Sequence, residues 1–117
     1  MLKLYTLANC DTCRRAAKWL RTHDISFEEH AIRDTPPTTG ELRTMLAAQG
    51  GEVRKLFNTF GRDYREMKLG GKLPGLTPSA VIALLAGNGN LVKRPFAVGP
   101  GVALVGFDEG VWAKALG

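Results

Sequence analysis

The fold is decided by residues 2–32, which read LKLYTLANCDTCRRAAKWLRTHDISFEEHAI. Apolar and polar residues alternate at positions 2–7, a pattern typical of a short strand with a buried face. Apolar residues then recur at helical spacing over 11–24, and residues 25–32 alternate again. A strand, a helix and a strand of these lengths, joined by a right-handed crossover, form a parallel pair. The sequence therefore predicts a βαβ unit at the start of the chain.

The middle of the chain, about residues 36–88, has the pattern of a helical insertion. Turn-forming prolines and threonines precede a helix that carries Leu42 and Met45, and Gly50-Gly51 ends it. Thr77-Pro78 opens a further helix, with proline in its first turn. Glycines interrupt the segment before it, so we expect residues 60–75 to be irregular.

The remaining residues predict two strands and a final helix. Residues 91–93 and 102–105 are apolar enough for strands, and the tight connection Gly99-Pro100-Gly101 indicates an antiparallel pair. The last helix is expected after Asp108. The whole pattern predicts one α/β domain spanning residues 1–117, with a mixed sheet covered by helices.

Composition narrows the classes of function. The chain has 117 residues, and 16 Lys and Arg against 11 Asp and Glu give a net charge of +5. The basic residues are scattered rather than arranged along one helix with aromatics between them, so we expect no direct binding of nucleic acid. No apolar run approaches the roughly 20 residues of a membrane span, and no leader segment is recognisable. We expect a cytoplasmic monomer that does not bind membranes.

Cys10 and Cys13 are the only two cysteines, and both lie between the first predicted strand and the first predicted helix. The start of a helix offers free N–H groups and a positive dipole end, and Arg14 and Arg15 follow. Each of these features lowers the pKa of a thiol. We expect Cys10 to be the exposed nucleophile. Cys13 is then expected to attack a sulfur adduct on Cys10, which releases the adduct and forms an intramolecular disulfide. A CxxC motif in a βαβ unit predicts redox or covalent thiol chemistry.

Two other interpretations of the cysteines stay open. In one, they are half-buried and act as small apolar residues. In the other, they form a zinc site with His23 and His30, although these spacings fit no common zinc-finger pattern. The histidines fall at a helix end and on a strand, so we expect no bound metal.

The residues around the thiols are candidates for binding an anion. Asn9 and Thr12 are placed to shape the thiol loop and to donate to an anion, although Asn before a helix is also ordinary turn chemistry. Asp11 belongs to the same loop, and it or Thr12 can cap the helix. Arg14 is either an anion ligand or part of the solvated helix face.

Three segments together resemble a known family. They are residues 4–20 with their CDTCRRAAKWL run, Lys93-Arg94-Pro95, and Val105-Gly106-Phe107. These segments resemble the ArsC/Spx family of thioredoxin-fold proteins, over nearly the whole chain and including the helical insertion. The likeness is greatest to its YffB-like and Spx-like branches.

The resemblance implies a thioredoxin-like fold of the glutaredoxin type, βαβ followed by ββα, with a helical insertion. It implies that Cys10 is the nucleophile, that Arg94 is a partner of an anion or of the thiolate, and that Pro95 is a cis proline facing the site. On sequence pattern alone, Arg94-Pro95 is equally a strand end with a solvated arginine.

The resemblance also implies three functions. The YffB-like branch is similar to glutathione-dependent thiol reductases, so glutathione is expected as a co-substrate with no cofactor bound. The Spx-like branch uses its cysteine pair as a disulfide switch and binds the C-terminal domain of the RNA polymerase α-subunit. Arsenate reductases of the family attack arsenate with the cysteine, and glutathione and glutaredoxin complete the cycle. We expect a glutathione-linked thiol oxidoreductase, with Cys10 as nucleophile and Cys13 as resolving thiol.

Of these three functions, arsenate reduction is the one that the sequence favours least. The family's arsenate reductases hold the oxyanion with three arginines, and the resemblance places Asn58 and Gly106 at two of those positions, so that only Arg94 is kept. A tetrahedral dianion is bound best by several bidentate guanidinium contacts. Arg14, Arg62 and Arg65 are candidates to take the place of the missing arginines, but the spacing does not show that they do.

Overall fold

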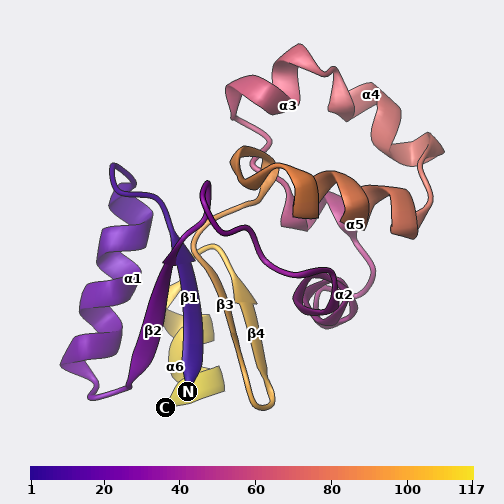
Figure 1. Ribbon diagram of the computed structural model, residues 1–117. Helices are drawn as coiled ribbons and strands as arrows, with labels where there is room; N and C mark the ends of the chain where they lie inside the picture. The colour runs from indigo at the N-terminus through magenta and orange to yellow at the C-terminus, as the bar shows by residue number, and fades with distance from the viewer.

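A computed structural model describes all of residues 1–117 and contains a four-stranded mixed sheet with helices on both faces (Figure 1). The strands are β1 (Leu2–Thr6), β2 (Phe27–Ala31), β3 (Phe96–Gly99) and β4 (Val102–Val105). They lie in the order β2-β1-β3-β4. β1 pairs parallel with β2 and antiparallel with β3, which pairs antiparallel with β4. The predicted α/β class and the parallel first pair are confirmed, and the last two strands are antiparallel as predicted, although the first of them is not at residues 91–93.

Helix α1 (Asp11–Thr22) and helix α6 (Glu109–Leu116) cover one face of the sheet. The alternation in β1 turns Leu2 and Leu4 to this side, where they join a cluster of nine buried residues. Trp19 of α1 and Trp112 of α6 meet edge to face there, with ring centroids 6.2 Å apart. Both indoles are buried, so the aromatic contact fixes α6 against α1.

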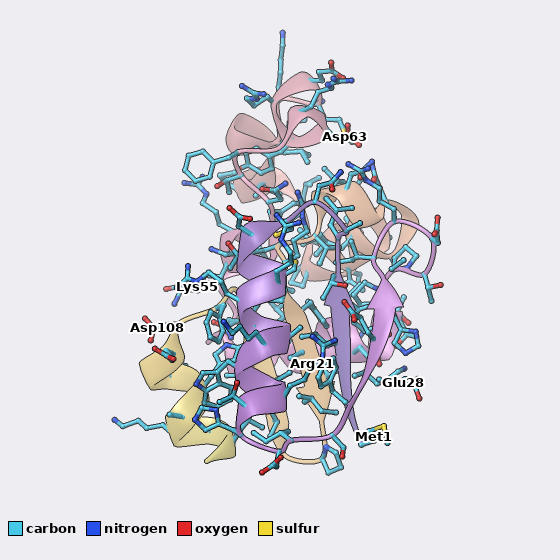
Figure 2. The ribbon with its side chains drawn as sticks, turned by 90° about the vertical axis from the view of Figure 1, so that its left-hand side faces the viewer. Met1, Arg21, Glu28, Lys55, Asp63 and Asp108 are labelled. Carbon is cyan, nitrogen blue, oxygen red and sulfur yellow. The ribbon has the colours of Figure 1, made fainter.

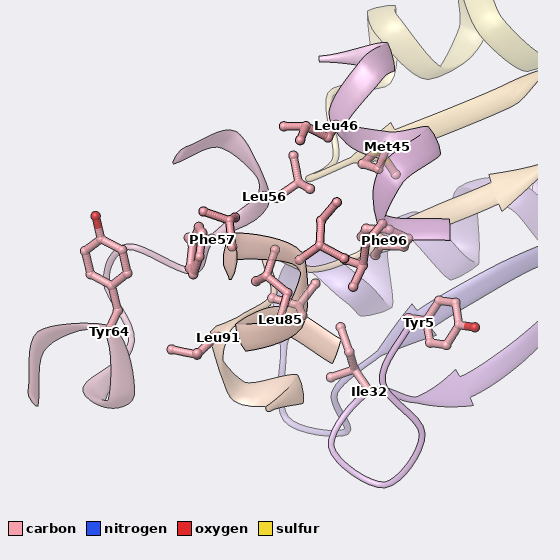
Figure 3. Close-up of a cluster of buried hydrophobic side chains, with 14 of the residues drawn as sticks. Tyr5, Ile32, Met45, Leu46, Leu56, Phe57, Tyr64, Leu85, Leu91 and Phe96 are labelled. Carbon is pink, nitrogen blue, oxygen red and sulfur yellow. The ribbon is translucent and has the colours of Figure 1, made fainter. Parts of the chain in front are cut away.

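The helices that lie between β2 and β3 in the chain are on the other side of the sheet, where the first of them packs on β4 and the short middle ones lie beyond the end of the sheet (Figure 1). These are α2 (Thr39–Ala48), η1 (Val53–Leu56), α3 (Arg62–Glu66), α4 (Leu69–Lys72), η2 (Leu73–Gly75), α5 (Pro78–Gly87) and η3 (Gly89–Leu91). Tyr5 and Phe96 of the sheet pack with Leu85 of α5 in a cluster of 17 buried residues (Figure 3). This larger cluster joins the insertion to the sheet.

Helix α2 is held to the sheet by a polar contact at its start. The Thr38 side chain accepts from the Glu41 backbone N–H at 3.2 Å, and the Glu41 carboxylate accepts from the Thr38 N–H, forming a capping box. The same carboxylate accepts from the Tyr5 hydroxyl at 2.6 Å and from the Lys3 ammonium at 2.9 Å. The cap of α2 is therefore also its attachment to β1.

The strand predicted at residues 91–93 is wrong. The chain passes through the turn η3, Val92 pairs only through an isolated bridge, and the strand is β3. The first three residues of β3 are buried in the centre of the sheet, where both faces are covered, so they lack the alternation that marks a half-exposed strand. Arg94-Pro95 consequently leads into β3 and does not follow a strand.

The segment predicted to be irregular, residues 60–75, contains the short helices α3 and α4 and the turn η2. Tyr64, Leu69 and Leu73 are buried in the larger cluster. Packing of these side chains stabilises helical turns that the glycines alone would disfavour. The longest helix, α1, has 12 residues, and no helix combines the length and the hydropathy that a membrane span needs.

Candidate thiol site

Cys10 lies where the chain leaves β1 and enters α1, at the carboxyl end of a central strand. It is the N-cap residue of α1, with extended backbone angles, and its sulfur accepts from the Cys13 backbone N–H at 3.4 Å. Its carbonyl accepts from the Arg14 N–H at 3.0 Å and so begins the helical ladder. The sulfur thus occupies the place of a capping oxygen, facing the free N–H groups of the helix.

The surroundings of Cys10 favour its thiolate. Burial of the half-exposed side chain opposes ionisation, but hydrogen bonding from the Cys13 side chain and backbone N–H outweighs it, together with the charge and hydrogen bonding of Arg94. The pKa of Cys10 is therefore lowered from its ordinary value. A thiol with a lowered pKa is a nucleophile near neutral pH.

Cys13 has the opposite character. It is 2% exposed, and burial raises its pKa, with the neighbouring Cys10 sulfur raising it further. Neither cysteine is in a disulfide. Cys10 is therefore the more accessible thiol and has a lowered pKa, whereas Cys13 is buried and has a raised pKa. The interpretation of both cysteines as half-buried, small apolar residues does not account for the lowered pKa of Cys10.

A cavity of about 190 Å³ opens beside Cys10, and Arg94 lines it. The peptide bond between Arg94 and Pro95 is cis, as the resemblance implies. Pro95 is buried, and its carbonyl accepts from the Gly106 N–H at 2.8 Å, which fixes the segment before β3 against the end of β4. The cavity is lined by Cys10, Thr12, Phe57, Asn58, Thr59, Phe60, Lys93 and Arg94.

The other residues predicted for the site are only partly brought together. Thr12 lines the Cys10 cavity. Asp11 and Arg14 are exposed and pair with each other at 2.6 Å, and Arg14 also donates to the Ala8 carbonyl at 3.4 Å. Arg14 borders a separate cavity with Cys13, and this cavity shares no lining residue with the one beside Cys10. Asn9 is exposed in the turn and lines neither cavity.

Sequence reasoning missed two conspicuous residues of this cavity. Phe60 is 91% exposed at its rim, on the loop before α3. Lys93 lines it beside Arg94. The adjacency of Lys93 to Arg94 in the sequence was one signal, and the position of Phe60 two residues after Asn58, which the resemblance places at the site, was another.

Asn58 and Gly106, which stand where the resemblance expects arginines, differ in their surroundings and backbone conformation. Asn58 lines the Cys10 cavity, so a polar side chain is present there but carries no charge. Gly106 has a φ of +71°, and a Cβ at this position would lie 3.0 Å from Cε of Lys93. A residue with a side chain is strained in this conformation, and the space is taken by the lysine.

The histidines lie apart from the thiols. His23 stacks on Trp19 with ring centroids 4.1 Å apart, and His30 stacks on Tyr5 at 5.2 Å. No group of three or more His, Cys, Asp or Glu side chains lies together in the structure. The arrangement gives no support to the zinc interpretation.

The sequence is similar to a family model and to known proteins. The model of the ArsC family matches residues 5–115. The chain is 38% identical to the uncharacterized protein YusI of Bacillus subtilis, over 92% of each chain. It is 30% identical to the global transcriptional regulator Spx 1 of Lactococcus lactis, over 93% of this chain and 84% of that protein.

A solved structure gives the same result for the fold. The crystal structure of an ArsC family related protein from Bacteroides fragilis superimposes with a TM-score of 0.90, at 42% identity, over 97% of this chain and 96% of the other. This confirms the predicted thioredoxin-like fold with its helical insertion. The chain belongs to the ArsC family.

Proposed function

We propose that this ArsC family protein is a thiol–disulfide oxidoreductase in which Cys10 attacks and Cys13 resolves. The observation that carries the proposal is the contrast between the two thiols. Cys10 caps α1 beside Arg94 and has a lowered pKa, whereas Cys13 is buried and has a raised one. A dithiol that reduces a disulfide needs one thiolate, which attacks the substrate, and a second thiol, which later resolves the mixed disulfide.

In the first step, the Cys10 thiolate attacks one sulfur of a disulfide substrate. A sulfur–sulfur bond forms between Cys10 and that half of the substrate, and the other half leaves as a thiolate. The guanidinium of Arg94 lies in the same cavity and stabilises negative charge on sulfur. The positive start of α1 acts in the same direction.

In the second step, Cys13 attacks the Cys10 sulfur. Burial raises the pKa of Cys13, and the negative charge of the Cys10 thiolate raises it further. Once Cys10 is part of a mixed disulfide, that charge is gone and Cys13 ionises more readily. The second half of the substrate leaves as a thiolate, and the protein holds a Cys10–Cys13 disulfide. Two electrons have passed from the protein to the substrate.

The oxidised protein must then be reduced, and we propose glutathione as the reductant. Two glutathione molecules would restore both thiols and leave as glutathione disulfide, in two further exchange steps. This assignment comes from the likeness to the YffB-like branch. Glutaredoxin is the alternative reductant that the resemblance offers.

The test is disulfide exchange with a small neutral substrate. Reduced protein is mixed with bis(2-hydroxyethyl) disulfide, and turnover with glutathione is followed through NADPH and glutathione reductase. The proposal expects turnover in the native protein and none above background in Cys10→Ser, because the remaining thiol, Cys13, is buried and has a raised pKa. Equal turnover in Cys10→Ser would disprove it.

A second candidate function is redox-dependent control of transcription. It is favoured by the CxxC pair together with the 30% identity to Spx 1. In this alternative, the Cys10–Cys13 disulfide changes binding to the RNA polymerase α-subunit. A pull-down of purified α-subunit by the reduced and the oxidised protein tests it. Equal recovery from both redox states would count against it, and recovery from one state alone would support it.

Arsenate reductase activity is the third candidate, and the site supports it least. Asn58 and Gly106 stand where the resemblance expects arginines, and Gly106 has a backbone that disfavours a side chain. The test is consumption of NADPH that depends on arsenate in the presence of glutathione and glutaredoxin. Such consumption, abolished by Arg94→Ala, would make arsenate reduction the leading candidate.

A further inference from the structure

A second cavity, of about 320 Å³, adjoins the one beside Cys10 and shares Asn58 and Arg94 with it. No hydrophobic residue lines it, and its charged lining comprises three arginines and one aspartate. The arginines come from three separate places in the chain: Arg33 from the turn after β2, Arg62 from α3, and Arg94 from the segment before β3. In Figure 2, Asp63 of α3 lies at the same end of the molecule as the start of α1.

Close contacts between distant parts of the chain fix the walls of this cavity. The Cβ of a residue replacing Gly89 would lie 1.9 Å from the Ile32 carbonyl oxygen, so only glycine lets η3 approach the turn after β2 so closely. That approach lets Arg33 donate from Nε to the Asn90 side-chain oxygen. Side-chain amides of Asn88 and Asn90 also donate to Asp63 at 3.0 and 3.4 Å, which attaches α3 to the same turn.

The protein offsets the positive charge in the cavity only in part. None of Arg33, Arg62 and Arg94 lies within 4.0 Å of a carboxylate oxygen in the ion pairs of the structure. Nε of Arg94 is buried and has no hydrogen-bond partner. The one acidic group, Asp63, already accepts from two amides. Guanidinium groups that lack a carboxylate partner around a polar cavity favour an anionic ligand.

We propose that this cavity is a subsite for the anionic end of a substrate whose sulfur reaches Cys10. Arg33 and Arg62 bind carboxylate groups there, and Arg94 lies between that subsite and the thiol cavity. The proposal rests on the proposed oxidoreductase function and adds a substrate class, namely low-molecular-mass disulfides that carry carboxylates. Arg33 and Arg62 are then specificity residues that distinguish anionic from cationic disulfides.

The test compares three disulfides of similar length and different charge: dithiodipropionate with two carboxylates, bis(2-hydroxyethyl) disulfide with no charge, and cystamine with two ammonium groups. Exchange with excess disulfide is stopped by alkylation and followed by intact mass. In each reaction the protein dithiol becomes a disulfide and the substrate leaves as two thiols. Each rate is divided by the rate of mercaptoethanol with the same disulfide, which removes differences in intrinsic reactivity.

We expect the native protein to prefer dithiodipropionate over cystamine, and added salt to reduce that preference. Arg33→Gln and Arg62→Gln should each lower the preference by about two- to fivefold, the size of one exposed charge interaction. The matched control is Arg43→Gln, which removes the same charge from an exposed position on α2 outside both cavities. It should leave the preference near the native value.

The possible results separate the two proposals. If the native protein reacts with none of the three disulfides, the proposed oxidoreductase function is wrong. If it reacts, but Arg33→Gln and Arg62→Gln behave as Arg43→Gln does, the subsite is wrong and the oxidoreductase stands. Thermal melting of each variant shows whether a lost preference comes from a lost fold.

Discussion

Replacing Gly89 with alanine should destabilise the protein far more than an ordinary exchange of glycine for alanine. The new Cβ would lie 1.9 Å from the carbonyl oxygen and 2.7 Å from the carbonyl carbon of Ile32, whereas real Cβ atoms stay at least about 3.0 Å from such neighbours. The backbones must therefore separate by about 1 Å. Ile32 resists this movement because it is fully buried and its N–H donates to the Thr6 carbonyl at 2.9 Å.

The cost follows from overpacking at a site where both sides are backbone. Inserting a carbon into a well-packed site costs about 1–3 kcal/mol, and two hydrogen-bonded backbones put this case at the upper end. With a urea m value of about 1–3 kcal/mol/M, a cost of about 3 kcal/mol lowers the unfolding midpoint by about 1–3 M. The measurement is urea denaturation of reduced Gly89→Ala and native protein, followed by tryptophan fluorescence.

The matched control is Gly71→Ala. Gly71 lies in α4, and a Cβ there would meet no atom within 4 Å. Alanine is favoured over glycine in a helix by about 0.5–1 kcal/mol, so this variant should be neutral or more stable. If Gly89→Ala unfolds at the same urea concentration as Gly71→Ala, the close approach of η3 to the turn after β2 is not what holds the arginine cavity together.

Three further outcomes are expected. Arg94→Gln removes a charge that lowers the pKa of Cys10, so alkylation of Cys10 by iodoacetamide should slow near neutral pH and the pH midpoint of the reaction should rise. An unchanged midpoint would show that Arg94 does not stabilise the Cys10 thiolate. Cys13→Ser should accumulate a mixed disulfide visible by intact mass, and rapid release of the adduct would exclude Cys13 as the resolving thiol. Burial opposes ionisation of Glu41, but hydrogen bonds from Tyr5 and others outweigh it and lower its pKa. Its contribution to stability is therefore present above its unfolded pKa of about 4.3 and lost as pH falls through the folded value. Glu41→Gln should show a weaker loss of stability in acid by urea denaturation, and an identical acid profile would contradict this role.

The βαβ unit and the thiol pair were predictable because their signals are local. The alternation in β1, the helical spacing in α1 and the cysteines between them all lie within some twenty residues, and each is close to what the structure contains. The misplaced third strand has a physical cause. Leu91 and Val92 are buried in the larger cluster without forming a strand, whereas β3 is covered on both faces and shows no alternation.

The parts of the site that come from the insertion were predicted only in part: Asn58 and Arg62 were candidates, but no local pattern in the sequence places them beside Cys10 or Arg94. Phe60 and Arg62 reach the thiol end of the sheet only because α3 folds back to η3 through the amides that bind Asp63. Arg33 joins them because Gly89 permits a close backbone approach. Contacts of this kind depend on tertiary packing between distant segments and leave no periodic pattern in the sequence.

The central claim is that Cys10 is an activated thiolate and Cys13 is not. The most direct measurement is ultraviolet absorbance of the thiolate against pH, in the reduced native protein and in Cys10→Ser and Cys13→Ser. The account predicts a first transition clearly below the ordinary cysteine pKa of about 8.5, present in Cys13→Ser and absent from Cys10→Ser. A first transition at or above that value, or one that persists in Cys10→Ser, would contradict it.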